Sequence, residues 1–233
     1  MYKTNIYKQA ENGNFDWETY FTPESTEKLF TRLDFPQVFS RLREHLKENK
    51  FRLAFALNRV MTRLLEGMSP HRPRILELGA ATGFLGRWLM RQYGGTGILV
   101  DNSKASYHAY TLVEDDIKEN ITYLNVDLFT LELQERFDLV CSFGLIEHFE
   151  DKQAVLDIHK KFVTPDGIMV ILVPLDTPLT RAFLEVHPEL NLGYRELLTE
   201  KEFTRILAQH GLRVTRAQVS KGYVYDFIGA VCR

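Results

Sequence analysis

The sequence has few of the residues that mark metal sites, membrane proteins and secreted proteins. It contains two cysteines, Cys141 and Cys232, and no CxxC motif or Cys/His cluster with the spacing of metal ligands. Each cysteine lies in an apolar run typical of a buried strand, so we expect two reduced core thiols. No apolar run approaches the roughly 20 residues of a membrane-spanning helix, and the N-terminus lacks the apolar segment of a signal peptide. These absences predict a cytoplasmic protein with no metal centre and no membrane partner.

Neither sign of charge is in excess. The chain has 29 basic and 31 acidic residues, which give a net charge of -2 at pH 7. Domains that bind nucleic acids usually carry a basic excess or a basic face, so we expect no nucleic-acid partner. The 233 residues suit one large α/β domain, or one such domain with an appended helical segment.

The first 70 residues differ in pattern from the rest. Apolar residues between about Phe51 and Met68 form a broad stripe at helical spacing, as expected for a helix that lies on a sheet. Two shorter helices are predicted before it. We interpret residues 1–70 as an N-terminal helical cap that forms one compact unit with the main domain, residues 71–233.

From residue 71 onward, short apolar runs alternate with amphipathic helical patterns. This alternation is typical of βαβ units and a mainly parallel sheet. The last two runs are separated only by Ser220-Lys221-Gly222, which is too short for a parallel crossover, so they are predicted to form an antiparallel hairpin. The predicted strands are residues 74–79, 97–101, 121–126, 137–143, 167–174, 212–219 and 223–231, and the predicted helices are residues 83–93, 103–117, 151–163 and 199–210.

The turn after the first predicted strand has the composition of a ligand-binding loop. It reads Gly79-Ala80-Ala81-Thr82-Gly83 and leads directly into a helix. Glycine allows the backbone to turn tightly and to approach a ligand closely, and a helix N-terminus offers unpaired N–H groups to an anion. Because ligands of open α/β sheets bind at the carboxyl ends of the strands, the turn indicates a nucleotide-like ligand. A purely structural turn is the alternative.

Acidic residues follow the second and third predicted strands. Asp101, in Asp101-Asn102-Ser103, is placed to accept hydrogen bonds from both hydroxyls of a ribose. Asp127 is placed to accept from an exocyclic amine, with Leu128 beside it as apolar surface for the ring. Together with the glycine turn, these residues predict an adenosine-containing ligand. Each acid has an alternative role, the capping of the helix or turn that follows it.

Glu147 and His148 follow the fourth predicted strand, where a reacting group would lie. Histidine titrates near neutral pH, so His148 is a candidate general base toward a hydroxyl, thiol or amine. Glu147 is a second candidate. A structural hydrogen-bonding role is the alternative for His148.

Two segments outside the predicted sheet are candidates for a substrate pocket. In the N-terminal cap, Tyr20 belongs to a group of aromatic residues placed to close over the ligand. Residues 175–198 form an insertion of roughly 20 residues, and insertions of that length in compact domains are usually functional. Arg181 and Tyr194 within it are the predicted substrate-binding residues, and ordinary packing is the alternative for the aromatic ones.

Taken in order, these motifs resemble those of the class I S-adenosylmethionine-dependent methyltransferases. The closest resemblance is to the small-molecule branch typified by the ubiquinone and menaquinone biosynthesis enzymes, and it covers roughly residues 72–232. Ala81 stands where that family most often has glycine. The motifs that carry the resemblance are Glu77-Leu78-Gly79-Ala80-Ala81-Thr82-Gly83, Phe-Asp-Leu-Val-Cys-Ser-Phe-Gly-Leu-Ile-Glu-His-Phe at residues 137–149, and Thr164-Pro165-Asp166-Gly167.

The resemblance implies a fold, a cofactor and an activity. The fold is Rossmann-like α/β, with seven strands in the order 3-2-1-4-5-7-6 and strand seven antiparallel. The cofactor is S-adenosylmethionine. Its methionine part would lie against Gly79, Ala81 and Gly83. Glu77 would stand behind these residues, and Phe143 would lie near the sulfonium. The implied activity is methyl transfer to an oxygen, nitrogen or carbon atom of a small molecule.

Other functions fit parts of the pattern. A protein is an alternative methyl acceptor, and the alanine at position 81 leaves open a non-catalytic module that binds S-adenosylmethionine. An NAD-dependent dehydrogenase fits less well, because residues 79–83 lack the G-x-G-x-x-G spacing. A nucleic-acid acceptor is disfavoured by the charge and by the absence of an Asn/Asp-Pro-Pro-aromatic loop after the fourth strand.

Overall fold

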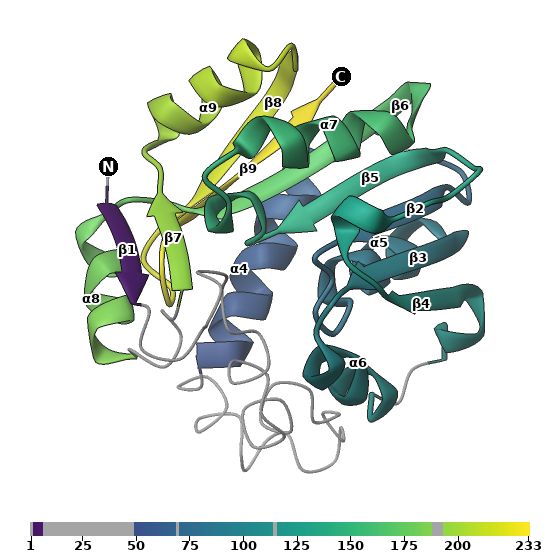
Figure 1. Cartoon of the computed structure of the whole chain (residues 1–233), viewed down its shortest axis with the longest axis horizontal. Coiled ribbons are helices and arrows are strands. Elements are labelled where there is room, and N and C mark those ends of the chain that lie inside the picture. Colours follow the sequence, from purple (N-terminus) through teal and green to yellow (C-terminus); the bar gives the residue numbers. More distant parts are fainter. Residues whose placement is uncertain (1, 7–48, 69, 114–115, 188–192) are drawn as a thin grey trace.

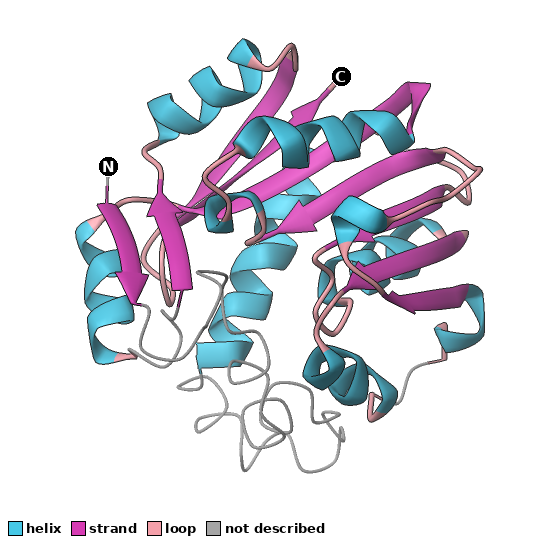
Figure 2. Cartoon of the chain, in the orientation of Figure 1, coloured by secondary structure: helices cyan, strands magenta, loops and turns pink. Residues whose placement is uncertain are grey.

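The fold is built around a seven-stranded sheet with helices on both faces (Figure 1 and Figure 2). The structure is a computed structural model that describes residues 2–6, 49–68, 70–113, 116–187 and 193–233. The sheet contains β2 (Arg74–Leu78), β3 (Thr96–Asp101), β4 (Ile121–Asn125), β5 (Phe137–Phe143), β6 (Val163–Pro174), β8 (Val214–Ser220) and β9 (Phe227–Cys232). The helices are α4 (Asn49–Leu64), α5 (Phe84–Tyr93), α6 (Lys104–Thr111), α7 (Lys152–Phe162), α8 (Pro178–Val186) and α9 (Glu200–Gln209), with short 3-10 turns η2 (Lys118–Asn120), η3 (Leu128–Thr130) and η4 (Ile146–His148).

The strand order is β4-β3-β2-β5-β6-β9-β8. Strands β2 to β6 pair in parallel, and β9 is antiparallel to both β6 and β8. Numbered within this sheet alone, the order is 3-2-1-4-5-7-6, so the predicted fold is confirmed. The order switches direction between β2 and β5. The crevice at the carboxyl ends of these two strands is where ligands of open α/β sheets bind.

Successive residues of β2 point to opposite faces of the sheet, as the two-residue period of a strand requires. Ile75 packs under α4 and α5, whereas Leu76 packs under α7 and α9. The helices contribute Leu57, Met61 and Leu64 from α4 and Leu85 and Leu89 from α5 on the first face, and Val155, Leu156, Phe203 and Leu207 from α7 and α9 on the second. Because of this alternation, the Glu77 side chain points toward α5.

Helix α4 confirms the helix expected between about Phe51 and Met68. Its end is capped by a side chain from the far edge of the sheet. The Arg216 guanidinium on β8 donates to the carbonyl oxygens of Arg63, Leu64 and Glu66, at 3.2, 2.9 and 2.6 Å. The carbonyls of Arg63 and Leu64 are groups that a helix end leaves without partners, and Glu66 lies two residues beyond it. The described helix of the N-terminal segment is therefore fastened to the main sheet.

The connection between β8 and β9 is longer than predicted. Strand β8 ends at Ser220 and β9 begins at Phe227, so residues 221–226 form the loop in place of a tight turn. The reason lies at Asp226. Its backbone N–H donates to the Thr180 hydroxyl at 3.1 Å, and its carbonyl accepts from the Leu175 N–H at 2.8 Å. These contacts hold the loop against the insertion and away from the β8–β9 ladder.

The insertion at residues 175–198 contains α8 and a short strand, β7 (Gly193–Leu197), that was not predicted. Strand β7 pairs antiparallel with β1 (Tyr2–Ile6) in a separate two-stranded sheet. Figure 1 shows this pair beside α8, at the edge of the molecule. Strand β1 lies within the segment interpreted as a helical cap. The local pattern missed it because its pairing partner is about 190 residues away in sequence.

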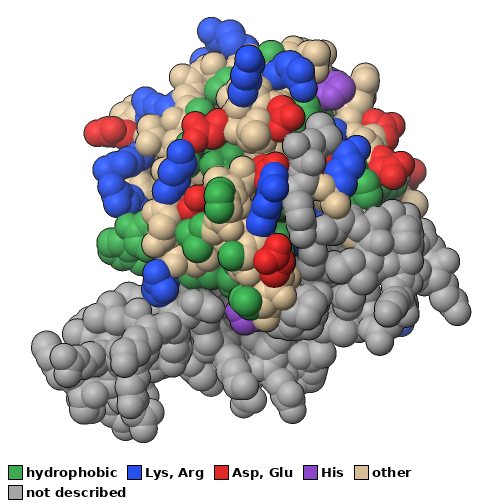
Figure 3. All heavy atoms as spheres, turned by 90° about the vertical axis from the view of Figure 1, so that its left-hand side faces the viewer, with side chains coloured by type: hydrophobic (Ala, Val, Ile, Leu, Met, Phe, Trp, Pro, Cys, Tyr) green, Lys and Arg blue, Asp and Glu red, His purple; other side chains and the backbone are tan. Residues whose placement is uncertain are grey.

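The described residues bear on several further predictions. Cys141 and Cys232 are buried free thiols, as predicted. No helix in the described ranges is long and apolar enough to cross a membrane. On the face shown in Figure 3, basic side chains of the described residues are interspersed with acidic and hydrophobic ones. Tyr20 lies outside the described residues.

Candidate functional site

The turn after β2 has a left-handed backbone at three positions. The φ angles are 64° at Gly79, 48° at Ala81 and 74° at Gly83. A Cβ atom on Gly79 would lie 2.7 Å from Cδ1 of Leu145, so the turn packs directly against the loop that follows β5. The left-handed conformation costs an alanine about 1–2 kcal/mol relative to its preferred conformations. The fold therefore has to hold Ala81 in place.

Side chains from the two neighbouring strands hold Ala81. Its N–H donates to Oδ2 of Asp101 at 2.8 Å, and its carbonyl accepts from the Tyr123 hydroxyl at 2.7 Å. The other Asp101 oxygen, Oδ1, accepts from the Ser103 N–H at 2.9 Å. Asp101 is 8% exposed. The predicted ribose-binding acid thus also shapes the glycine turn, and the alternative expected for it, bonding to the start of the next helix, is present.

Glu77 is buried behind the turn. Its Oε2 accepts a hydrogen bond from the Gly86 N–H at 2.8 Å, in the first turn of α5. Burial raises the pKa of the Glu77 carboxyl to about 8. A Cβ atom on residue 86 would lie 2.8 Å from both Glu77 Oε2 and the Leu99 side chain. Gly86 is a part of the site that the sequence interpretation missed, although glycine near the start of a helix was a visible signal.

The tips of β3 and β4 are tied together by Asn125. Its Nδ2 donates to the carbonyl oxygens of Asp101 and Ser103, at 2.9 and 3.0 Å. Asn102 is exposed at the same tip.

Asp127 follows β4 and is exposed. Its Oδ1 accepts a hydrogen bond from the Phe129 N–H at 2.8 Å, and this bond caps η3. Leu128, the first residue of η3, is half-buried. The capping role considered for Asp127 is therefore present.

The loop after β5 carries a buried carboxyl. Phe143 ends the strand, with its ring centroid 5.4 Å from that of Phe227. Glu147, in η4, is 1% exposed. Among the described residues, its Oε2 has no hydrogen-bond partner. Burial raises the pKa of Glu147 to about 7, against the opposing charges of Arg195 and Lys152. A buried carboxylate oxygen without a partner costs free energy, so it marks a place for a ligand donor.

His148 is held by both ring nitrogens. Its Nδ1 lies 3.0 Å from the carbonyl oxygen of Tyr194, which can only accept, so Nδ1 carries the proton. Its Nε2 lies 3.4 Å from Nη2 of Arg195 and accepts from it. Burial, followed by the charge of Arg195, lowers the pKa of His148 well below its usual value. The imidazole is therefore neutral.

Strand β7 brings further charged side chains to this loop. Lys152 on α7 forms an ion pair with Glu196, and its Nζ also donates to the Phe149 carbonyl at 3.0 Å. The Tyr194 hydroxyl donates to Oε2 of Glu196 at 2.9 Å. Lys3 on β1 lies 3.7 Å from the same carboxylate. The insertion is thus fastened to the loop after β5 by buried polar contacts.

The two predicted substrate residues of the insertion have different surroundings. Tyr194 contacts the loop after β5 through its backbone carbonyl. Arg181 instead forms a two-pronged ion pair with Asp176, with bonds of 2.6 and 2.8 Å. Arg195, Glu196 and Lys152 belong to the site but were not among the predicted site residues. Charged residues inside the insertion were the available signal for the first two.

Comparison with known proteins identifies the family. Residues 42–217 match the family model described as a methyltransferase domain. The chain belongs to this family. The predicted class I fold, the enzyme class and S-adenosylmethionine as the cofactor are confirmed.

The matches to individual curated relatives cover less of the chain than the match to the family model. The chain is 34% identical over 107 residues to a ubiquinone biosynthesis O-methyltransferase of Rhodopseudomonas palustris, and 31% identical over 108 residues to a malonyl-[acyl-carrier protein] O-methyltransferase of Magnetococcus marinus. Each match covers 46% of this chain and 40% of the relative, so less than half of either relative's length is spanned.

Solved structures are similar over most of the chain. A magnesium protoporphyrin IX methyltransferase from Synechocystis, with bound S-adenosylhomocysteine, superimposes with a TM-score of 0.63 at 16% identity and covers 93% of this chain and 97% of its own. An N-methyltransferase from Bradyrhizobium japonicum, in complex with the same compound, has a TM-score of 0.58 at 16% identity, with coverage of 93% and 98%. At this identity the likeness concerns the fold.

Proposed function

We propose that this protein transfers the methyl group of S-adenosylmethionine to a small-molecule acceptor, with Glu147 as the group that takes the acceptor's proton. The observation that carries the proposal is the buried Glu147 Oε2, which has no hydrogen-bond partner in the described part of the chain. Its loop touches the glycine turn through Leu145 and Gly79. Acceptor and cofactor would therefore meet at the crevice between β2 and β5.

The residues at the turn fit the proposed cofactor. Gly79 and Gly83 present backbone without side chains, and Ala81 adds only a methyl group. In Asp101 each oxygen accepts a backbone N–H, and because a carboxylate oxygen can accept more than one hydrogen bond, the same group can also accept from a ribose hydroxyl. The remaining proposed cofactor-binding residues are Glu77, Asn102, Asp127, Leu128 and Phe143.

Glu147 suits the role of base better than His148. A general base is most effective when its pKa lies near the working pH, and burial raises that of Glu147 to about 7. Protonation of His148 would place a second positive charge beside Arg195. We therefore assign His148 a positioning role, in which it holds Arg195 and β7 against the loop after β5.

Methyl transfer needs little chemistry from the protein. The bound cofactor would supply a methyl group that is already activated. When the methyl–sulfur bond breaks, the positively charged sulfur keeps both bonding electrons and becomes neutral. The protein has to orient the acceptor, exclude water and hold the released proton. In this assignment Glu147 Oε2 holds the proton, and Arg195 stabilises the negative charge that develops on the acceptor. Tyr194 lines the acceptor pocket; Arg181 and Tyr20 are the other proposed acceptor-binding residues.

The names of the curated relatives support an oxygen acceptor as the first to test. Both are O-methyltransferases, one in ubiquinone biosynthesis and one of malonyl-[acyl-carrier protein]. We infer that a small hydroxyl or carboxyl compound is methylated. A protein acceptor, a nitrogen atom or a carbon atom is a separate outcome of the same experiment.

Calorimetry and labelling test the function together. The full chain is expected to bind S-adenosylmethionine and its demethylated product saturably and to show no binding of NAD. With methyl-labelled S-adenosylmethionine and a fractionated cell extract, label is expected in the metabolite fraction. Clear binding of NAD without binding of S-adenosylmethionine would overturn the proposal. Label confined to proteins would replace the small-molecule acceptor by a protein one.

A further inference from the structure

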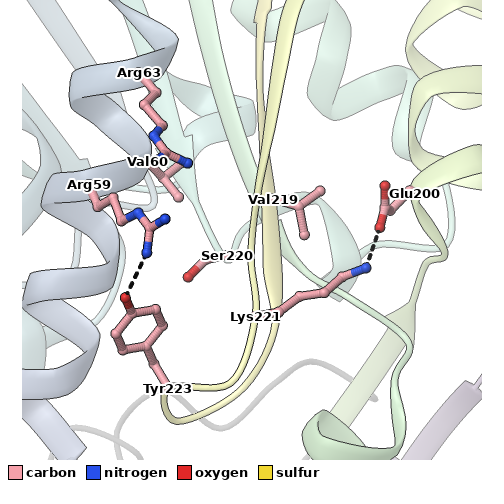
Figure 4. Close-up of a pocket in the computed structure, with 8 residues that line it drawn as sticks. All are labelled: Arg59, Val60, Arg63, Glu200, Val219, Ser220, Lys221 and Tyr223. Atoms are coloured by element: carbon pink, nitrogen blue, oxygen red, sulfur yellow. Dashed lines mark hydrogen bonds and ion pairs between the residues drawn. The ribbon is translucent and has the colours of Figure 1, made fainter.

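A second cavity lies outside the methyl-transfer site, at the outer edge of the sheet. It has a volume of about 370 Å³ and lies between α4, the loop after β8 and the start of α9. Figure 4 shows Arg59 and Arg63 on the α4 side, and Lys221 and Glu200 on the opposite side. The glycine turn, Asp101 and Glu147 do not line it, so it is a candidate site of its own.

The lining of this cavity is rich in positive charge. Arg59 and Arg63 are one helical turn apart and so lie on the same face of α4. The Arg59 Nη1 donates to the Tyr223 hydroxyl at 3.1 Å. Among the described residues, no hydrogen bond or ion pair engages the Arg63 guanidinium. Lys221 is paired with Glu200 at 3.0 Å. The described lining of the cavity thus has three cationic side chains and a single acidic one, a net charge of +2.

A largely buried serine also lines this cavity. Ser220, the last residue of β8, is 5% exposed and lines the cavity. Figure 4 shows its oxygen directed toward the α4 side, between the strand and the two arginines. Within the described ranges, its side chain takes part in no hydrogen bond. The hydroxyl itself is open to the cavity, so Ser220 offers a donor to a ligand that also contacts the arginines.

We propose that this cavity binds a small molecule through a phosphate group, held by the guanidinium of Arg63 and the hydroxyl of Ser220. Guanidinium binds both phosphate and carboxylate in a two-pronged manner. The net charge decides between them, because a phosphate monoester carries about -1.5 to -2 charges near pH 7 and a single carboxylate carries one. The volume is within the usual range for small-molecule sites, roughly 300–1,000 Å³, and leaves room for more than the phosphate itself.

The test uses the full chain with inorganic phosphate as the probe, titrated by calorimetry in a buffer of low ionic strength. Saturable binding with one phosphate per chain is expected. In two-dimensional NMR spectra, the largest shifts are expected around Ser220 and Tyr223. Acetate at the same concentrations is expected to bind at least about tenfold more weakly, since it carries half the charge. No saturable phosphate binding, or equal binding of acetate, would overturn the proposal.

Variants of the two proposed phosphate-binding residues test where the phosphate binds. Arg63→Gln is expected to weaken phosphate binding at least about tenfold, since it removes a charged hydrogen-bonding partner, and Ser220→Ala several-fold. Arg213→Gln is the matched control, because this exposed arginine lies at the opposite end of β8. Phosphate affinity that is equal in Arg63→Gln and the unmodified protein would contradict the assignment. Binding of S-adenosylhomocysteine is expected to be unchanged in every variant and by added phosphate, and competition between the two would show that the cavity is no separate site.

Discussion

Asp101 Oδ2 accepts a hydrogen bond from the backbone N–H of Ala81, across 2.8 Å and between two different loops of the sheet. This bond joins the tip of β3 to the glycine turn after β2. The Tyr123 hydroxyl completes the arrangement from β4 by bonding to the Ala81 carbonyl. The conformation of the turn therefore depends on residues in two other strands, and we expect the proposed binding of the cofactor to depend on them as well.

Tyr123→Phe is expected to weaken S-adenosylhomocysteine binding several-fold, although no direct contact with the ligand is assigned to Tyr123. The variant removes only the hydroxyl that holds the Ala81 carbonyl, so the turn loses part of its preorganisation. Calorimetry measures the effect. Tyr107→Phe is the matched control, since Tyr107 belongs to the same aromatic cluster but is 43% exposed. Equal dissociation constants for the two variants would remove Tyr123 from the site.

Ala81→Gly is expected to raise the free energy of unfolding by up to about 1.5 kcal/mol. Glycine relieves the left-handed strain of about 1–2 kcal/mol, and the greater freedom of glycine in the unfolded chain offsets roughly 0.5–1 kcal/mol of that gain. Urea unfolding measures the difference. Ala80→Gly is the control: Ala80 has no positive φ, so this variant should be less stable than the unmodified protein. Destabilisation of similar size at both positions would mean that Ala81 is not strained.

Glu147→Gln is expected to lower kcat by roughly 10²–10⁴, the usual contribution of a general base, with little change in cofactor affinity. In the unmodified protein, activity should rise with pH through about 7, because the carboxylate form is the base. The pH–rate profile of a His148→Asn variant should keep this midpoint at a reduced rate, because His148 acts through Arg195 and β7.

Exposed Glu132→Gln serves as the control for Glu147→Gln and should leave both kcat and the midpoint unchanged. A pH–rate midpoint near 7 that survives in Glu147→Gln would rule out this carboxyl as the base. If the midpoint were lost only in the His148 variant, the imidazole would be the base instead.

The free energy of unfolding is expected to decrease as the pH falls from about 6.5 to about 4, because His159 is protonated more readily in the unfolded chain. Its Nδ1 bonds to the Val155 carbonyl at 2.8 Å and its Nε2 to the Ser142 hydroxyl at 2.9 Å. Burial lowers the pKa of His159 to about 4. In this pH window the unfolded chain binds more protons than the folded one, so protonation favours unfolding.

Protonation of His159 is expected to lower the free energy of unfolding by about 3 kcal/mol in full. This value follows from a pKa of about 6.5 in the unfolded chain and about 4 in the folded one, with 1.36 kcal/mol for each tenfold change in the acid dissociation constant. Urea unfolding at pH 4.5, 5.5 and 7 measures it. His159→Gln should flatten the pH dependence, and exposed His108→Gln should leave it as it is. Parallel curves for the unmodified protein and His159→Gln would contradict a buried neutral histidine.

Much of the sheet was predictable because strands such as Arg74–Leu78 and Phe137–Phe143 are mostly apolar runs between recognisable helices. The glycine turn and the acids at the next two strand tips were visible for the same reason, since each directly follows such a run. The order of the strands came from the family resemblance. By contrast, β1 and β7 are short strands whose pairing joins residues 2–6 to residues 193–197, and no local periodicity indicates it.

The sequence by itself therefore determined the class of fold and the family, and it predicted the position of the ligand crevice, because these depend on patterns within about ten residues. Only the tertiary structure decided the backbone conformation and the charge state of the residues around the crevice. It holds Ala81 in a left-handed conformation through Asp101 and Tyr123. It also keeps His148 neutral by burying the imidazole and by placing Arg195 beside it. Both effects depend on contacts between residues 20 to 47 positions apart, whose distance, burial and charge only folding establishes.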